Sequence, residues 1–166
     1  MSPMLAQSVV ALLLALAGPA RGVAAGAVPP ESLLVEVRGR VTVLRRADLA
    51  GMARDSVRAT FRGVGHTYAG VRLTDVLRRA GVAVDSAHGT NLVSRVLVEA
   101  SDGWRVIFSL PELLPAFAGR RVLVADLMDG AALPGNEGPW RLLCPDDGEE
   151  HARWVRGVVA IRVRAE

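Results

Sequence analysis

Short segments in which apolar and polar residues alternate recur from residue 33 to the end of the chain. LLVEVRG (33–39) and RVTVL (40–44) have the alternation of β-strands, and RATFRG (58–63) predicts a third strand. Further strands are predicted at RRVLVAD (120–126), WRLLC (140–144) and VVAIRVR (158–164). The pattern therefore favours a chain built largely from short strands.

The apolar spacing changes to a helical period in RLTDVLRRAGV (72–82). The apolar residues that share one helical face are Leu73, Val76, Leu77 and Ala80. Gly81 follows them, at the position where a helix often ends in a left-handed residue. The sequence therefore predicts an amphipathic helix that ends at Gly81.

The segment SRVLVEASDGWRVIFSLPELL (94–114) predicts two strands followed by a short helix. Asp102 and Gly103 favour a tight turn between the strands. Ser109 is expected to cap the helix, with Glu112 completing a capping box. Because strands and helices follow one another without regular β-α-β alternation, we expect a mixed α+β fold.

The composition is ordinary for one globular domain, because about half of the 166 residues are apolar. All 20 basic residues are Arg, so lysine Schiff-base chemistry is excluded. The net charge is only +3, the Arg residues alternate with 17 acids, and aromatic residues make up 4% of the chain. Nucleic-acid binding typically needs a clustered basic surface, so we expect no nucleic-acid partner.

The N-terminus has the features of an export signal. SVVALLLALAG (8–18) is apolar but too short to cross a bilayer, and GVAAGA (22–27) offers small residues for signal peptidase. We expect a signal peptide at 1–27, a linker at 28–32 and one domain at 33–166. The mature protein is then periplasmic or secreted, without a stable membrane anchor. The alternative is a buried N-terminal helix.

Four motifs in order resemble a known family, the oxidoreductase molybdopterin-binding domain found in sulfite oxidase and its bacterial relatives. They are YAGVRLTDVLRRAGV (68–82), ASDGWRVIFSLPEL (100–113), VLVADLMDGAALPGNEGPWRLLCPDD (122–147) and RWVRGVVAIRV (153–163). The resemblance implies a mixed-sheet α+β domain that holds a pyranopterin in a cleft between sheet and loops. It also implies molybdenum bound to a protein cysteine.

The sequence departs from this family at the metal position. Catalytic relatives carry the cysteine near the end of the strand that includes Arg62, and here Gly63 or a close neighbour takes its place. Glu137 stands where relatives commonly have a histidine, and the leader lacks the twin-Arg signal of members exported with cofactor. We therefore expect no bound cofactor, or molybdopterin only if the protein is an enzyme.

LLCPDDGEEHARWVRG (142–157) contains zinc-ligand residue types, with Cys144, four acids and His151 within eight residues. In the family an apolar strand residue takes the place of Cys144, so we expect its thiol to be packed and unreactive. Residues 146–151 are then a loop whose acids point into water. No metal ligand is assigned.

The candidate ligand-binding residues are Arg62, His66, Tyr68, Arg141, Arg153 and Arg156. The resemblance places the arginines near the cofactor phosphate, and arginines in a cleft suit phosphate or carboxylate. His66 and Tyr68 are expected in the loop that would carry the metal. The alternatives are surface arginines paired with acids and a solvated histidine. Trp104 and Trp154 are expected to pack at the edge of the core.

These observations favour an exported, non-catalytic binding or accessory module without bound molybdenum. Its partner would be an unknown small anionic ligand or a protein. The alternative function is a molybdopterin-dependent oxidoreductase of the sulfite oxidase type with an unusual metal site. No G-x-S-x-G motif supports hydrolytic chemistry, and whether the protein is an enzyme is left open.

Overall fold

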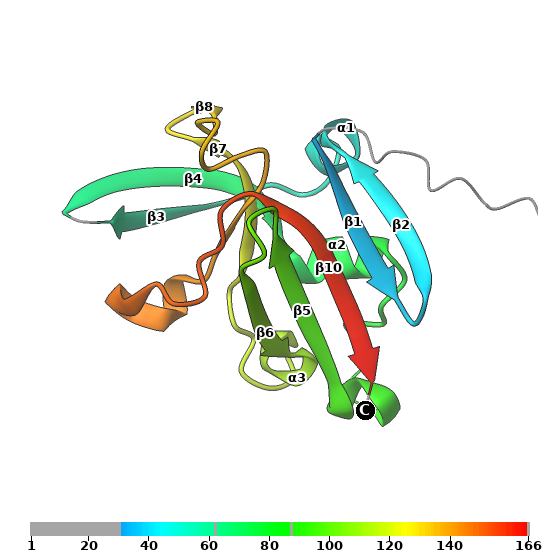
Figure 1. Ribbon diagram of the computed structural model, residues 1–166. Helices are drawn as coiled ribbons and strands as arrows, with labels where there is room; N and C mark the ends of the chain where they lie inside the picture. The colour runs from blue at the N-terminus through cyan, green and yellow to red at the C-terminus, as the bar shows by residue number, and fades with distance from the viewer. Residues whose placement is uncertain (1–30, 62, 87, 166) are drawn as a thin grey trace, which may run out of the picture.

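The computed structural model describes residues 31–61, 63–86 and 88–165, which form two β-sheets with short helices (Figure 1). Sheet A consists, in spatial order, of β2 (Arg40–Arg45), β1 (Ser32–Val37), β10 (Val158–Ala165), β5 (Ser94–Ala100) and β6 (Arg105–Ser109). Sheet B consists of β3 (Asp55–Phe61), β4 (Val64–Arg72), β7 (Leu123–Met128) and β8 (Ala131–Ala132), with β9 (Arg141–Leu143) also paired to β7. β1 and β10 are parallel and the other pairs are antiparallel.

The helices are short and lie between strands. They are α1 (Arg46–Ala50), α2 (Leu73–Arg79) and α3 (Leu110–Leu113), with the 3₁₀ helices η1 (Gly89–Val93) and η2 (Pro145–Glu150). The mixed sheets and few helices confirm the predicted α+β class. The expected signal peptide, residues 1–27, lies outside the described residues. Among the described residues, no helix is long and apolar enough to cross a membrane.

Several strands differ from their predicted bounds or places. β3 begins at Asp55, three residues before its predicted start, and ends at Phe61. β7 begins at Leu123, three residues later than predicted, because Arg120 and Arg121 lie outside the sheet and bind carboxylates instead. His66 and Tyr68 were expected in a loop but lie in β4, a strand that pairs with β3 on one side and β7 on the other. The β3–β4 hairpin extends away from the rest of the molecule (Figure 1).

The structure confirms helix α2 and the β5–β6 turn, which were both predicted from the local sequence. The four residues assigned to one helical face are all buried, and Gly81 has a φ of +95°. Gly103 has a φ of +87°, and the side chain of Asp102 accepts a hydrogen bond from the backbone N–H of Trp104 at 2.9 Å. Trp104 itself is 57% exposed, so its predicted packing against the core is wrong.

The capping box that begins α3 is also confirmed. The hydroxyl of Ser109 accepts a hydrogen bond from the backbone N–H of Glu112 at 3.3 Å, and the Glu112 carboxylate accepts one from the backbone N–H of Ser109 at 2.8 Å. These two bonds satisfy N–H groups that a helix of four residues would otherwise leave unpaired.

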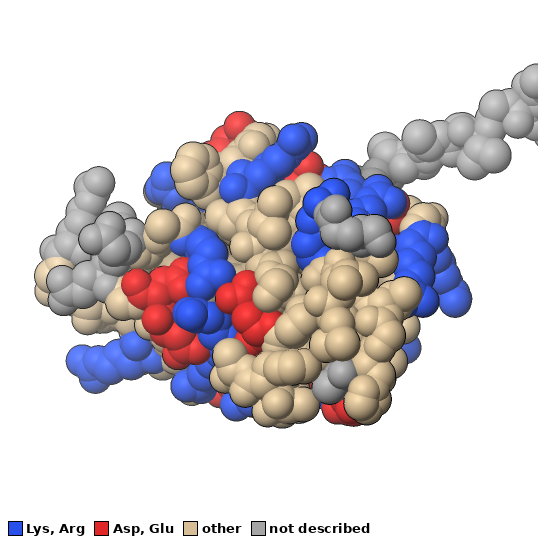
Figure 2. Space-filling model, turned by 90° about the horizontal axis from the view of Figure 1, so that it is seen from below, with Lys and Arg blue, Asp and Glu red and all other residues tan. Residues whose placement is uncertain are grey.

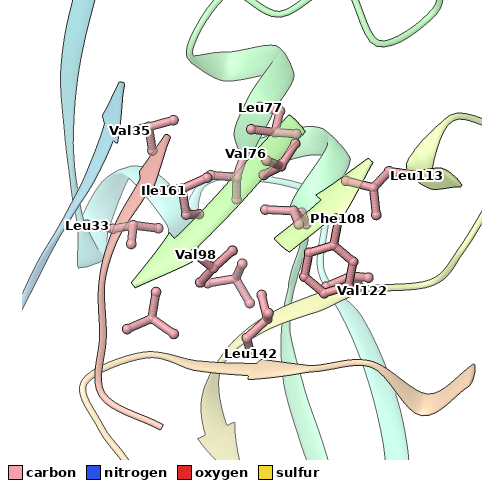
Figure 3. Packing of buried hydrophobic residues seen from close by; sticks show 14 of the residues in the cluster. Leu33, Val35, Val76, Leu77, Val98, Phe108, Leu113, Val122, Leu142 and Ile161 are labelled. Carbon is pink, nitrogen blue, oxygen red and sulfur yellow. The ribbon is translucent and has the colours of Figure 1, made fainter. Parts of the chain in front are cut away.

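The main core lies between the inner face of sheet A, α2 and one face of sheet B. Figure 3 shows residues from all three parts in contact, including Leu33, Ile161, Val76 and Leu142. These side chains are completely buried. The apolar stripe of α2 and the alternating apolar residues of β1 and β10 meet here, which is the burial that the sequence pattern predicts.

Sheet B carries a second, smaller apolar cluster on its other face. Its buried residues are Val57, Ala59, Tyr68, Leu123, Ala125 and Leu143, and Leu133 and Trp154 pack against them. β4 and β7 approach closely at Gly70, where a Cβ atom would lie 2.1 Å from the carbonyl oxygen of Val124. Tyr68 of β4 and Leu143 of β9 both belong to this cluster, and Arg141 lies opposite Ala125 on the same face, where the candidate site lies.

Candidate functional site

Arg141 is the centre of a small polar group inside the second cluster. It lies in β9, opposite Ala125 of β7, and is only 4% exposed. Its Nη1 donates a hydrogen bond to the Tyr68 hydroxyl at 3.0 Å and forms an ion pair with Glu137. The guanidinium carbon lies 5.0 Å from the centre of the Tyr68 ring and 5.6 Å from that of Trp154. Two aromatic faces and a carboxylate therefore offset its desolvation.

One donor of Arg141 remains unused. Its Nε is buried and has no hydrogen-bond partner among the described residues. Burial raises the pKa of Tyr68, and nearby Arg141 opposes that effect only in part. The hydroxyl therefore stays protonated at neutral pH and can accept from Arg141 while offering its own proton. The group can supply hydrogen-bond donors to an anionic atom.

His66 and Asp129 form a second pair beside Tyr68. His66 Nδ1 lies 2.6 Å from Asp129 Oδ2, and Oδ1 accepts a hydrogen bond from the backbone N–H of Thr67 at 2.8 Å. The Thr67 N–H, and next to it His66, lower the pKa of Asp129. The rings of His66 and Tyr68 lie edge to face, with their centres 6.3 Å apart. Nδ1 is thus held by a carboxylate, and Nε2 remains for another partner.

Because both residues belong to β4, their predicted place in a loop is wrong. Alternation along a strand puts residues 66 and 68 on the same face of the sheet, which is why the histidine lies next to the tyrosine. Pairing with β7 also brings Asp129, the residue after that strand, to His66. The strand therefore positions the pair more rigidly than a loop would.

Arg153 belongs to a different group. Its Nε donates to Asp147 Oδ2 at 2.8 Å, and its Nη1 lies 3.3 Å from Glu112. Its guanidinium carbon is 4.6 Å from the centre of the Phe108 ring. Arg120 also reaches Asp147, at 3.2 Å. Asp147 lies at the centre of this group, and Arg153 lowers the pKa of that carboxyl, so Asp147 stays ionised beside the two arginines.

Of the six predicted ligand-binding residues, the structure thus brings together His66, Tyr68 and Arg141. Arg153 is bound in the Asp147 group, and Arg156 is exposed in the segment before β10. Arg62 lies outside the described residues.

Cys144 is completely buried at the end of β9, which confirms the prediction of a packed side chain. Burial, and then a hydrogen bond with Asp147, raise the pKa of its thiol to about 12. The next residues form η2 rather than a loop, and Asp147 points inward instead of into water. Within the described part of the chain, no three His, Cys, Asp or Glu side chains converge as metal ligands do.

Sequence reasoning missed two partners in the site. Glu137 was singled out only as a departure from the family, although its spacing of four residues from Arg141 could have indicated a pair. Asp129 is 63 residues from His66 in the sequence, and nothing in the sequence indicated that the two would meet. Trp154 packs at the edge of the second cluster, as expected, and its Nε1 also donates to the carbonyl oxygen of Cys144 at 3.0 Å.

The chain therefore forms a two-sheet α+β domain with a buried arginine and a tyrosine on the outer face of one sheet. A family model for the oxidoreductase molybdopterin binding domain matches residues 35–166. The protein belongs to that family, as its sequence motifs indicated. The comparison with curated proteins gave no match.

The donor atoms of this chain do not fit a thiolate-bound molybdenum centre. Cys144 is the one cysteine in the sequence, and its thiol is buried and protonated. Gly63, near the position of the family's cysteine, is exposed in the β3–β4 turn and has a φ of +80°. Molybdenum needs a soft anionic donor at that place, and neither glycine nor a neutral imidazole supplies one. No reaction step is therefore derived through this metal.

Proposed function

We propose that this protein is an exported binding or accessory module of the molybdopterin-binding-domain family that works without molybdenum. It acts in the periplasm or as a secreted protein and recognises a small anionic ligand or a protein partner. It binds no nucleic acid, and it keeps no membrane anchor once the signal peptide is removed.

The state of Cys144 is the observation that carries this proposal. A thiolate is the form that binds metal, and a thiol whose pKa is about 12 is protonated throughout the physiological range. Its Asp147 neighbour already accepts hydrogen bonds from Arg153. Moving Cys144 to a metal would therefore break a buried ion-pair group at the end of β9.

The face of sheet B around His66 and Tyr68 is the proposed ligand site. It offers the Nε2 of His66, whose side chain is partly exposed, and behind it the buried hydroxyl of Tyr68 and the buried, unpaired Nε–H of Arg141. Such donors suit the oxygens of an anion, and Glu137 restricts access to the arginine.

Metal and pterin analysis of protein purified from its native exported pool tests whether the molybdenum centre is absent. We expect molybdenum far below one equivalent and no pterin fluorescence. A catalytic member of the family, purified in parallel, is the control and must contain both. Near-stoichiometric molybdenum in this protein would overturn the proposal. Sequencing the N-terminus of the same sample tests export, because we expect the mature chain to begin between Gly22 and Val28.

NMR titration with inorganic phosphate and sulfate tests the ligand site. We expect the His66 ring resonances to shift, and the shift to weaken in Tyr68→Phe. Thr67→Ala is the matched control, because residue 67 points to the opposite face of β4. Equal effects of the two variants, or no shift in the native protein, would contradict the proposed site.

A further inference from the structure

Two adjoining hollows lie far from the Tyr68 site, beside the end of α2. The first has a volume of about 240 Å³ and lies among the β1–β2 turn, the segment after α2, η1 and the end of β10. The second has a volume of about 280 Å³ and runs along β2. They share Arg40, Ala80 and Gly81, so they form one groove, which we call the Gly81 groove.

Three arginines line the Gly81 groove, namely Arg38, Arg40 and Arg79. In the described part of the chain, none of them forms an ion pair with a carboxylate, and the guanidinium of Arg38 donates to the Thr90 hydroxyl. Other arginines do form ion pairs. Arg121 and Arg153, for example, each contact an acidic side chain. Figure 2 shows blue side chains at the right edge, where Figure 1 places the β1–β2 turn. Among the described residues, these three guanidinium groups therefore have no carboxylate in ion-pair contact, although Asp48 lines the second hollow.

The groups of opposite polarity in the groove accept hydrogen bonds from backbone N–H groups. Asp48 lines the second hollow, but its Oδ2 accepts a hydrogen bond from the backbone N–H of Arg45 at 2.8 Å. The last carbonyl oxygens of α2 accept hydrogen bonds from the N–H groups of residues 80–82, at distances of 3.0 to 3.1 Å. The negative end of this short helix is thereby largely satisfied, which weakens its repulsion of an anion.

The floor of the groove is open at Gly81. A Cβ atom built on this residue would meet no atom within 4 Å, so a ligand can approach the backbone there. Its φ of +95° follows from its place after the helix. The groove thus combines space, a glycine and three guanidinium groups that form no ion pair within the described chain.

We propose that the Gly81 groove binds a small ligand that carries phosphate or carboxylate groups. A guanidinium donates two parallel hydrogen bonds to such an oxyanion, and three guanidinium groups can neutralise more than one negative charge. The two hollows are large enough for a compact ligand with two or three anionic groups. This site is separate from the proposed site at Tyr68 and does not depend on it.

Calorimetric titration of the full chain with pyrophosphate and with citrate tests the proposal. We expect saturable binding of at least one probe, weakened by about tenfold or more in Arg40→Gln/Arg79→Gln, because each lost charge-assisted bond to an anion has roughly this effect. Pyrophosphate binding without citrate binding would identify phosphate as the recognised group, and the converse would identify carboxylate.

Arg78→Gln/Arg105→Gln is the matched control. It removes the same charge from exposed arginines, one of them next to Arg79 on the same helix, but these two contact acids and do not line the groove. Salt-dependent attraction to the whole protein would fall equally in both double variants. Equal weakening, or no saturation with either probe up to about 10 mM, where the binding energy would be no more than marginal, would overturn the proposal.

Amide NMR of the same titrations locates the ligand. We expect the N–H resonances of Gly81 and Ala83 to shift, because both residues line the groove, whereas those of Thr67 and Asp129 stay in place. If the double variant does not fold, Arg79→Gln and Arg78→Gln form a single-residue pair with the same expected contrast. Shifts confined to the Tyr68 site would refute binding in the groove.

Discussion

Two groups of arginines in this protein differ in whether they have carboxylate partners. Around Asp147 and Glu137, buried or half-buried arginines contact carboxylates and aromatic rings. In the Gly81 groove, Arg40 and Arg79 contact no carboxylate of the described chain. Figure 2 shows the same difference, with red and blue interleaved at the left and blue without much red at the right. The number of arginines in a region therefore says little about ligand binding. Whether an arginine already has a carboxylate partner indicates whether it can still bind an anion.

The two arrangements have different energetic consequences. A buried ion pair is costly to break, because removing one partner leaves the other charge without water and without compensation. An exposed, unpaired arginine contributes little to stability and repels its neighbours. We therefore expect variants of the paired groups to lose stability and variants of the groove to lose binding.

The largest effect is expected for Glu137→Gln. The change leaves Arg141, which is 4% exposed, without its carboxylate while the Nε is already unpaired. We expect the free energy of unfolding to fall by about 3 kcal/mol, at the lower end of the range for broken buried pairs because Glu137 keeps some contact with water. Chemical denaturation measures it.

Glu31→Gln is the control for that prediction. Glu31 pairs with Arg46, but its side chain is 60% exposed, so the loss should stay below about 0.5 kcal/mol. Similar losses in the two variants would mean that burial does not distinguish the ion pairs, and the comparison between regions would fail.

A smaller loss, about 2 kcal/mol, is expected for Asp147→Asn. This carboxylate is shared by Arg120 and Arg153, and both side chains keep part of their exposure, so water can replace some of the lost contacts. The amide can still accept one hydrogen bond. Thermal unfolding measures the change. Unchanged stability would mean that Glu112, which already lies 3.3 Å from both arginines, compensates their charge without Asp147.

Periodicity predicted most of the fold because most elements have one buried face. The helix at Leu73 and the strands at Leu33 and Val158 follow their apolar patterns closely. β4 was missed because VGHTYAGVR contains two glycines and a histidine and lacks a regular apolar alternation, and its stability comes from pairing on both sides. Tertiary pairing therefore overrode a weak local pattern.

The sites were less predictable than the fold. The sequence indicated Tyr68 and Arg141 through a family resemblance, but it did not indicate that Glu137 neutralises the arginine. The groove was missed completely, because Arg38, Arg40 and Arg79 are ordinary surface residues until the β1–β2 turn meets the end of α2. Neutralisation depends on long-range contacts, which sequence spacing does not reveal.

Acid titration should reveal the contribution of one further ion pair, between Arg121 and Asp55, to stability. Arg121, and to a lesser extent Arg72, lower the pKa of Asp55 from 3.8 to about 2. The pair therefore stabilises the fold above pH 4, and this contribution is lost as the pH falls from about 4 to about 2. Since the groups keep contact with water, we expect a loss of about 1 kcal/mol. We therefore expect the difference in the free energy of unfolding between the native protein and Asp55→Asn, measured by denaturation, to be smaller at pH 2.5 than at pH 5.

The smallest effect on stability is expected for the groove variant Arg40→Gln/Arg79→Gln. Neither arginine has a carboxylate partner in the described residues, so the free energy of unfolding should change by less than about 0.5 kcal/mol. At low ionic strength the variant should gain slightly from reduced repulsion, and salt near 1 M should abolish that gain. Urea denaturation at two salt concentrations measures both. A loss above about 1.5 kcal/mol would show that these arginines hold the fold together, which would remove the contrast with the Asp147 and Glu137 groups. Unchanged stability together with lost pyrophosphate or citrate binding is the combination that assigns the Gly81 groove to a ligand.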